Sequence, residues 1–201
     1  MQLTENDLHR DPFQQFASWF EDAKKAQPLN PEGMTLATVG DDGTVSARIV
    51  LLKGFDSRGF VFYTNYGSHK GVQLHENPRA ALVFWWPALE RQVRIEGAVV
   101  RVTEEESDAY FASRPRGSQL GAWASDQSRP ISGRAGLDAR RQEMESTYRD
   151  LAIPRPPHWG GYRVIPLMIE FWQGRSDRLH DRFAYRLRSD SKDWTVERLS
   201  P

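Results

Sequence analysis

Five short apolar segments fill the first half of the chain, and most of them are joined by turns. They span residues 34–39, 45–55, 60–66, 80–86 and 92–102. Clusters of Asp, Ser and Gly after the first two segments are typical turn signals. Parallel neighbours need a long crossover connection, whereas antiparallel neighbours need only a short turn. The pattern therefore predicts an antiparallel sheet, curled into a barrel.

Helices are predicted on either side of these strands. Asp11 is a good N-cap, Pro12 suits the first helical position, and aromatic residues follow at helical spacing. Ser68 caps a short second helix, and Thr103 with Glu106 forms the capping box of a third. Each of these helices follows or precedes a predicted strand, so the helices are expected to flank the sheet.

The second half of the chain alternates less regularly. We predict a Gly- and Ser-bearing connector up to Gly133 and a helix over residues 135–151. A hairpin over residues 162–173 and 178–188 and a last strand over residues 194–199 follow. Returning strands favour one domain over residues 1–201, mainly β, with an N-terminal helix and a C-terminal hairpin.

Composition excludes several classes of function. Lys plus Arg and Asp plus Glu are both 27, so no global field attracts nucleic acid or an anionic membrane. The chain has no cysteine, and its five histidines lack metal-site spacing. Residues 1–10 do not resemble a signal peptide. We expect no metal, no nucleic-acid partner, no membrane association and a cytoplasmic location.

Two segments place cations where an anion could bind. In Arg48-Ile-Val-Leu-Leu-Lys53, strand alternation puts one cation on each face. Cations that reach solvent at strand ends would explain this pattern equally well. In the second segment, a strand enters a helix whose first residues include Ser68, His69 and Lys70. A helix N-terminus suits a phosphate, although a surface lysine is the alternative.

Two further segments carry grouped polar side chains. Tyr110 and Arg114 share a helix face and precede Ser118 in a predicted turn, which together could bind phosphate. Solvated arginines are the alternative. Arg178, His180 and Arg182 would project from one face of an extended strand. Three aligned cations call for an anion, unless salt bridges on an exposed hairpin neutralise them.

These segments make the chain resemble the pyridoxamine 5'-phosphate oxidases over residues 11–201. Any one motif is weak evidence, but their order along the chain is specific. The matching stretches are Arg48-Ile-Val-Leu-Leu-Lys53, Phe62-Tyr-Thr-Asn65, Arg91-Gln-Val-Arg94, Tyr110-Phe-Ala-Ser-Arg-Pro115, Ser118-Gln-Leu-Gly-Ala-Trp123, Trp159-Gly-Gly-Tyr162, Glu170-Phe-Trp-Gln-Gly174 and Arg178-Leu-His-Asp-Arg182.

The resemblance implies an FMN-binding split barrel, a Greek-key-like antiparallel barrel of six strands, in a homodimer with FMN at the interface. It implies oxidation of pyridoxamine and pyridoxine 5'-phosphates to pyridoxal 5'-phosphate. Hydride passes to flavin N5, O2 becomes H2O2, and the amine releases NH3. The flavin carries the redox chemistry, and the protein orients the two rings.

The resemblance also implies roles for individual residues. Arg178 and His180 are the expected catalytic residues and face the substrate ring. Substrate phosphate is expected at Lys53, Tyr110, Arg114 and Ser118. The residues expected to bind FMN are Arg48, Ile49, Val50, Leu51, Leu52, Lys53, Tyr63, Thr64, His69, Lys70, Gln92, Gln127, Ser128, Trp172 and Arg182.

Two departures from the family pattern bear on these roles. His69 stands where arginine is usual, and Asn30 stands where an acidic residue is common. Two other functions remain open at this point. One is a related oxidase of phenazine biosynthesis, which should not need a substrate-phosphate pocket. The other is an FMN- or pyridoxal-phosphate-binding protein without turnover.

Overall fold

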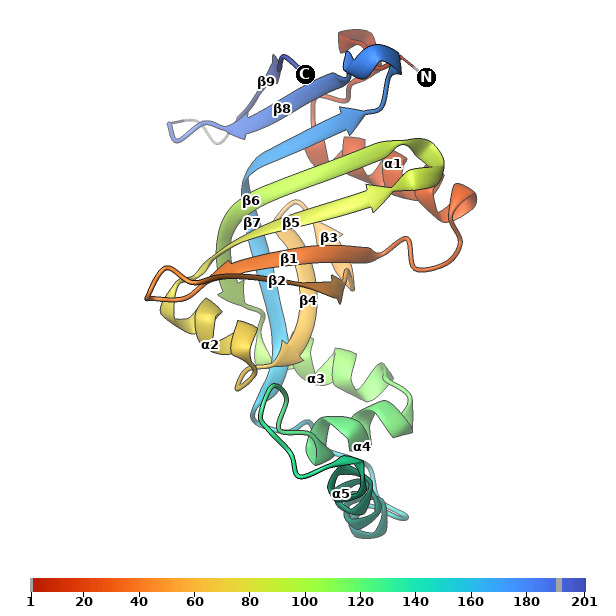
Figure 1. The fold of residues 1–201 in the computed structure, drawn as a ribbon, viewed down its shortest axis with the longest axis vertical. Coiled ribbons are helices and arrows are strands. Elements are labelled where there is room, and N and C mark those ends of the chain that lie inside the picture. Colours follow the sequence, from red (N-terminus) through yellow and green to blue (C-terminus); the bar gives the residue numbers. More distant parts are fainter. Residues whose placement is uncertain (1, 191–192) are drawn as a thin grey trace.

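The computed structural model describes residues 2–190 and 193–201. Within these ranges nine strands form one antiparallel sheet (Figure 1). The strands are β1 (Gly33–Val39), β2 (Val45–Leu51), β3 (Gly54–Asp56), β4 (Gly59–Asn65), β5 (Arg79–Trp86), β6 (Arg91–Arg101), β7 (Trp159–Gln173), β8 (Asp181–Leu187) and β9 (Trp194–Arg198). Their order is β2-β1-β5-β6-β7-β4-β3, and β8 and β9 extend from β7.

Two residues bring the ends of this sheet together. β2 and β3 stand at opposite ends of the strand order, yet only Leu52 and Lys53 separate them in the sequence. The Leu52 N–H donates to the carbonyl of Glu32 beside β1 at 2.9 Å, and the Lys53 N–H donates to Val61 in β4 at 2.8 Å. Successive residues thus bond to opposite ends of the sheet, which curls into a partly open barrel.

The predicted fold, mainly β with flanking helices, is confirmed, with two differences in the strands. The single strand predicted over residues 45–55 is wrong, because the Leu52–Lys53 crossing divides it into β2 and β3. The sheet also contains more strands than the six-stranded barrel. The break makes β3 a separate strand, β8 pairs with β7, and β9 pairs with β8.

The predicted helix starts are confirmed. α1 (Pro12–Ala26) begins where the Asp11 side chain accepts the N–H of Phe13, and α2 (His69–Glu76) begins at the Ser68 cap. α3 (Glu104–Ser113) carries the Thr103–Glu106 capping box. α1 packs on the barrel through Phe16, whose ring lies 4.9 Å from Phe60 and 5.1 Å from Phe84.

One helix was not predicted. α4 (Arg116–Ala124) occupies part of the expected connector, followed by α5 (Arg134–Thr147). Gly117 and Gly121 weaken the local helix signal. The helix is stabilised instead by burial of Leu120 and Ala124. Ser118 therefore lies on a helix and not in the predicted turn.

The predicted extended run from Arg178 to Arg182 is also wrong. Residues 176–178 form a 3-10 turn, and Asp177 and Arg178 have positive φ angles of 57° and 61°. β8 begins only at Asp181. Left-handed backbone at two successive residues breaks the alternation of a strand, so Arg178, His180 and Arg182 do not form one regular strand face.

Candidate active site

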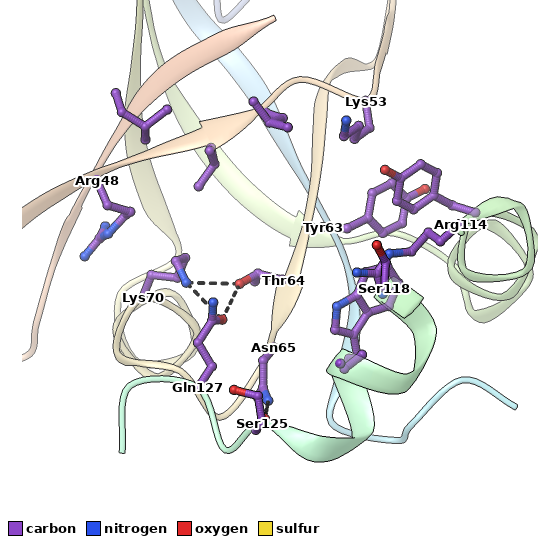
Figure 2. A pocket seen from close by; sticks show the side chains of 17 residues that line it. Arg48, Lys53, Tyr63, Thr64, Asn65, Lys70, Arg114, Ser118, Ser125 and Gln127 are labelled. Atoms are coloured by element: carbon purple, nitrogen blue, oxygen red, sulfur yellow. Dashed lines mark hydrogen bonds between the residues drawn. The ribbon is translucent and has the colours of Figure 1, made fainter. Parts of the chain in front are cut away.

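A cavity of about 600 Å³ lies against β2 and β4 and the helices α2, α3 and α4 (Figure 2). Strand β2 and Lys53 form one wall of the cavity. Thr64, Lys70 and Gln127 form another part of the cavity lining. The lining residues are Arg48, Ile49, Val50, Leu51, Lys53, Tyr63, Thr64, Asn65, Lys70, Tyr110, Arg114, Ser118, Gly121, Ala122, Ser125, Gln127 and Trp159.

The lining is strongly cationic. Arg48, Lys53, Lys70 and Arg114 all contribute to it, and the described lining residues include no Asp or Glu. Figure 2 shows Arg48 with Lys70 on one side and Lys53 with Arg114 on the other. We call these pairs the first and second cation clusters. Cations gathered without carboxylates favour binding of anions.

In the first cluster, Lys70 is a buried ammonium that donates hydrogen bonds to uncharged groups. Its Nζ donates to Thr64 Oγ1 at 3.1 Å, to Ser68 Oγ at 3.2 Å and to Gln127 Oε1 at 3.2 Å. Burial, reinforced by the nearby Arg48 cation, lowers the pKa of Lys70 from 10.5 to about 8. An anion bound here would stabilise the charged lysine and so offset the effects of burial and of the Arg48 cation on its pKa.

Arg48 lies on the same side of the cavity as Lys70, and its hydrogen bonds also go to neutral acceptors. Its Nη1 donates to Leu36 O at 3.2 Å and to Thr38 Oγ1 at 2.6 Å, and its Nη2 donates to Ser46 Oγ at 2.7 Å. Burial lowers the pKa of the guanidinium, although arginine stays protonated in proteins. These bonds leave part of the guanidinium fork for a ligand.

The second cluster is built on stacked aromatic rings. The rings of Tyr63 and Tyr110 stack 3.9 Å apart, and Trp159 stacks on Tyr63 at 5.5 Å. The Arg114 guanidinium lies 4.5 Å from the Trp159 ring centroid. Its Nη1 is buried without a hydrogen-bond partner in the described part of the chain. Such a donor costs about 1–3 kcal/mol unless a ligand accepts from it.

The structure therefore brings most of the predicted phosphate-binding residues together. Other predicted residues lie outside this cavity: Leu52 is buried, His69 is exposed, and Ser128 lines a neighbouring cavity. The remaining predicted residues outside it are Gln92, Trp172, Arg178, His180 and Arg182.

These last residues belong to a second patch around β7 and β8. Trp172 pairs with Gln92 of β6 on one side and with Arg182 of β8 on the other. The His180 ring lies 4.5 Å from Trp172, and its Nδ1 accepts the N–H of Arg175 at 3.1 Å. In Figure 1, β8 lies at the end of the molecule opposite α4 and α5.

Comparison with known proteins identifies the family. Residues 20–148 match the family model described as pyridoxamine 5'-phosphate oxidase. The chain belongs to the pyridoxamine 5'-phosphate oxidase family. Residues 159–201 match the pyridoxine 5'-phosphate oxidase C-terminal dimerisation region, which contains β7, β8 and β9. The family predicted from the motifs is therefore confirmed.

Full-length relatives support this assignment. The chain is 61% identical to a pyridoxine/pyridoxamine 5'-phosphate oxidase of Acaryochloris marina, covering 99% of this chain and 90% of the relative. It is 58% identical to that of Cupriavidus metallidurans, covering 99% and 93%.

Two solved structures share the fold of this oxidase family member. PhzG from Burkholderia lata, in complex with tetrahydrophenazine-1-carboxylic acid, aligns with a TM-score of 0.91 at 33% identity, covering 100% of this chain and 98% of the other. An FMN-binding, pyridoxamine 5'-phosphate oxidase-related protein from Nostoc punctiforme aligns at 0.76 and 18% identity, covering 96% and 100%. The latter likeness concerns the fold alone.

Several residues that line the cavity of this oxidase family member have no role predicted from the sequence. Trp159 is the most important, because it stacks on Tyr63 and supports Arg114. Its signal was the Trp159-Gly-Gly motif. Asn65, Gly121, Ala122 and Ser125 also line the cavity. The last three belong to α4 or follow it. Because α4 was not predicted, their place at the cavity was not predicted either.

Two features are absent among the residues that the structure describes. No group of three or more His, Asp or Glu side chains is arranged to hold a metal ion among them. No helix within the same residues is long and apolar enough to cross a membrane.

Proposed function

We propose that this chain oxidises pyridoxine and pyridoxamine 5'-phosphates to pyridoxal 5'-phosphate, with FMN as cofactor and O2 as electron acceptor. The products include H2O2, and the amine also consumes water and releases NH3. One observation carries the proposal: the cavity holds two separate cation clusters and no lining carboxylate among the described residues. FMN and substrate each carry one phosphate, so two anions match two clusters.

The first cluster fits the FMN phosphate. Lys70 and Arg48 supply charge, and the N-terminus of α2 adds free N–H groups. Gln127 already contacts Lys70, and Ser128 follows it in the sequence. Residues 49–51 would run alongside the flavin ring. The redox chemistry would come from bound FMN, as acceptor of a hydride from the substrate C4' carbon and donor of the electrons to dioxygen.

The second cluster fits the substrate phosphate. Lys53 and Arg114 supply charge, and Tyr110 and Ser118 supply hydroxyl groups. Support comes from the buried Arg114 Nη1, which lacks a partner among the described residues. A phosphate oxygen would accept a charge-assisted hydrogen bond from Arg114 Nη1. Stacked rings fix this guanidinium before substrate arrives, so little ordering is needed on binding.

We propose that a second copy of the chain completes each site. Gln92, Trp172, Arg178, His180 and Arg182 lie on the separate patch at β7 and β8, within or beside the dimerisation region. A two-fold homodimer can bring this patch of one protomer to the cavity of its partner. β2 also exposes apolar side chains that a partner would cover, with Val45 70% and Ile49 67% exposed.

Arg178 and His180 would then act on the substrate ring. A planar guanidinium can stack over the pyridine and hold it against the flavin. His180 Nδ1 accepts a backbone N–H from Arg175, so Nε2 carries the proton of the neutral ring. Nε2 can therefore donate a hydrogen bond to a ring substituent of the substrate.

A phenazine-type oxidase is the alternative that the fold permits, since PhzG aligns closely at 33% identity. The ligand named for that structure is a carboxylic acid without phosphate. The second cluster and the higher identity to the curated oxidases favour the phosphorylated substrate.

The cytoplasmic location remains a prediction. A single domain over residues 1–201 is supported by the one sheet that joins the described strands.

The test is to purify the full chain, record its visible spectrum and add pyridoxine 5'-phosphate under air. We expect a yellow protein that releases FMN on denaturation, with a mass near twice 23.1 kDa by light scattering. Aldehyde and H2O2 should form in equal amounts. A colourless protein that takes up no FMN contradicts the cofactor assignment. Bound FMN without turnover favours the alternative of an FMN- or pyridoxal-phosphate-binding protein that is not an enzyme.

A further inference from the structure

A buried glutamine connects the helix that carries Lys70 to the guanidinium of Arg48. Gln73 lies on α2 and is 3% exposed. Its Oε1 accepts hydrogen bonds from Thr38 Oγ1 at 2.6 Å and Ser46 Oγ at 2.7 Å. The same two hydroxyl groups accept from Arg48, at 2.6 and 2.7 Å. Two parallel chains of hydrogen bonds thus run from Arg48 to one amide oxygen.

The direction of each hydrogen bond in this network is determined. Arginine can only donate, so each hydroxyl oxygen accepts from Arg48 and must direct its single proton elsewhere. An amide oxygen has two lone pairs and receives both protons. Gln73 Nε2 then donates to the carbonyl of Thr44 at 3.3 Å, which orients the amide. Every member of the network has a partner, and such networks hold one geometry.

We propose that Gln73 is a positioning residue that holds Arg48 in the orientation that binds the FMN phosphate. This inference rests on the proposed function, which assigns Arg48 and Lys70 to that phosphate. Gln73 is not among the residues that line the cavity. It acts through Thr38 and Ser46, which hold the two Nη atoms of Arg48 in a fixed plane.

The position of Gln73 on α2 gives this network a second effect. Lys70 and Gln73 are three residues apart, so they lie on neighbouring turns of one helix. Thr38 lies on β1, while Ser46 and Arg48 lie on β2. The network therefore sets the position of α2 relative to β2, and with it the separation of the two cations that face the phosphate.

The test compares two flavins that differ only in the phosphate. FMN and riboflavin are titrated into flavin-free full-length protein, and binding is followed by quenching of flavin fluorescence. We expect Gln73→Met, which keeps side-chain length but removes the acceptor, to weaken FMN binding about 10-fold. Riboflavin binding should change less than about 2-fold. A purely structural role would lower the melting temperature and weaken both flavins equally, which would overturn the inference.

Variants of Thr38 keep the test decisive if Gln73→Met does not fold. Thr38→Val removes one hydroxyl with little change in shape, and Thr38→Ser retains it. We expect loss of FMN-over-riboflavin preference in the valine variant and near wild-type preference in the serine variant. Equal preference in both variants contradicts a role for this network.

Arg48→Met separates failure of this inference from failure of the proposed function. If Arg48→Met leaves the preference for FMN unchanged, the phosphate assignment itself is wrong. If Arg48→Met abolishes the preference while Gln73→Met and Thr38→Val do not, the assignment stands and the positioning role is refuted.

Discussion

Binding of FMN should weaken as pH rises above about 8, and Lys70 should be the cause. In the free protein, burial and the Arg48 cation lower the pKa of this lysine to about 8. Its three neighbours are neutral oxygens, so nothing among its contacts stabilises the charged form as an anion would. A bound phosphate dianion would raise the pKa again. Above pH 8, binding must therefore take up a proton.

The size of the effect follows from this pKa. At about pH 7.5 most Lys70 is charged before FMN binds, whereas at about pH 9.5 only about one molecule in 30 is charged. If the complex keeps Lys70 fully protonated, the dissociation constant for FMN should rise about 20-fold between these pH values.

The stability of the free protein should increase with pH, whereas FMN binding weakens. Between pH 8 and 10.5 the unfolded lysine holds more protons, so the free energy of unfolding should rise with pH.

The assay is fluorescence titration of FMN at both pH values, with urea unfolding of the free protein alongside. Lys70→Met removes the titrating group and should show weak, nearly pH-independent binding in this range. Lys70→Arg keeps a permanent charge and should also lose the pH dependence. If wild-type protein binds FMN equally at both pH values, or if Lys70→Met retains the full decline, the reasoning is refuted.

Four other substitutions test the remaining assignments. Arg114→Met should raise the KM for pyridoxine 5'-phosphate about 10- to 100-fold, because it removes a charge-assisted hydrogen bond, and steady-state kinetics would show whether it does. Arg178→Ala should leave the flavin spectrum intact but slow anaerobic flavin reduction about 100-fold. Arg182→Ala should slow reduction and also lower the flavin content of the purified protein. A wild-type reduction rate in Arg178→Ala would contradict the role of Arg178. His69→Arg should tighten FMN binding by about 1 kcal/mol, measured by titration, and unchanged affinity would place His69 away from the phosphate.

Much of the local structure was predictable, because its causes lie within a few residues. The caps at Asp11 and Ser68 involve hydrogen bonds to the N–H groups of Phe13 and Gly71. Alternation along β2 follows from strand geometry, and the structure shows it in the alternating burial of residues 45–51. Family motifs also predicted that Lys53, Tyr110, Arg114 and Ser118 would act together, and the cavity brings them together.

Other features depend on partners far away in the sequence, and only the tertiary structure decided them. Leu52 and Lys53 look like a continuing strand, yet their N–H groups bond to opposite ends of the sheet. Lys70 meets Gln127, which lies 57 residues away, and Gln73 meets Thr38, 35 residues away. Neither contact leaves a local pattern. Whether a cation is solvated or held in a cavity depends on such long-range packing. The sequence alone therefore left both alternatives open for Arg48 and Lys70, and the tertiary structure places both side chains at the cavity.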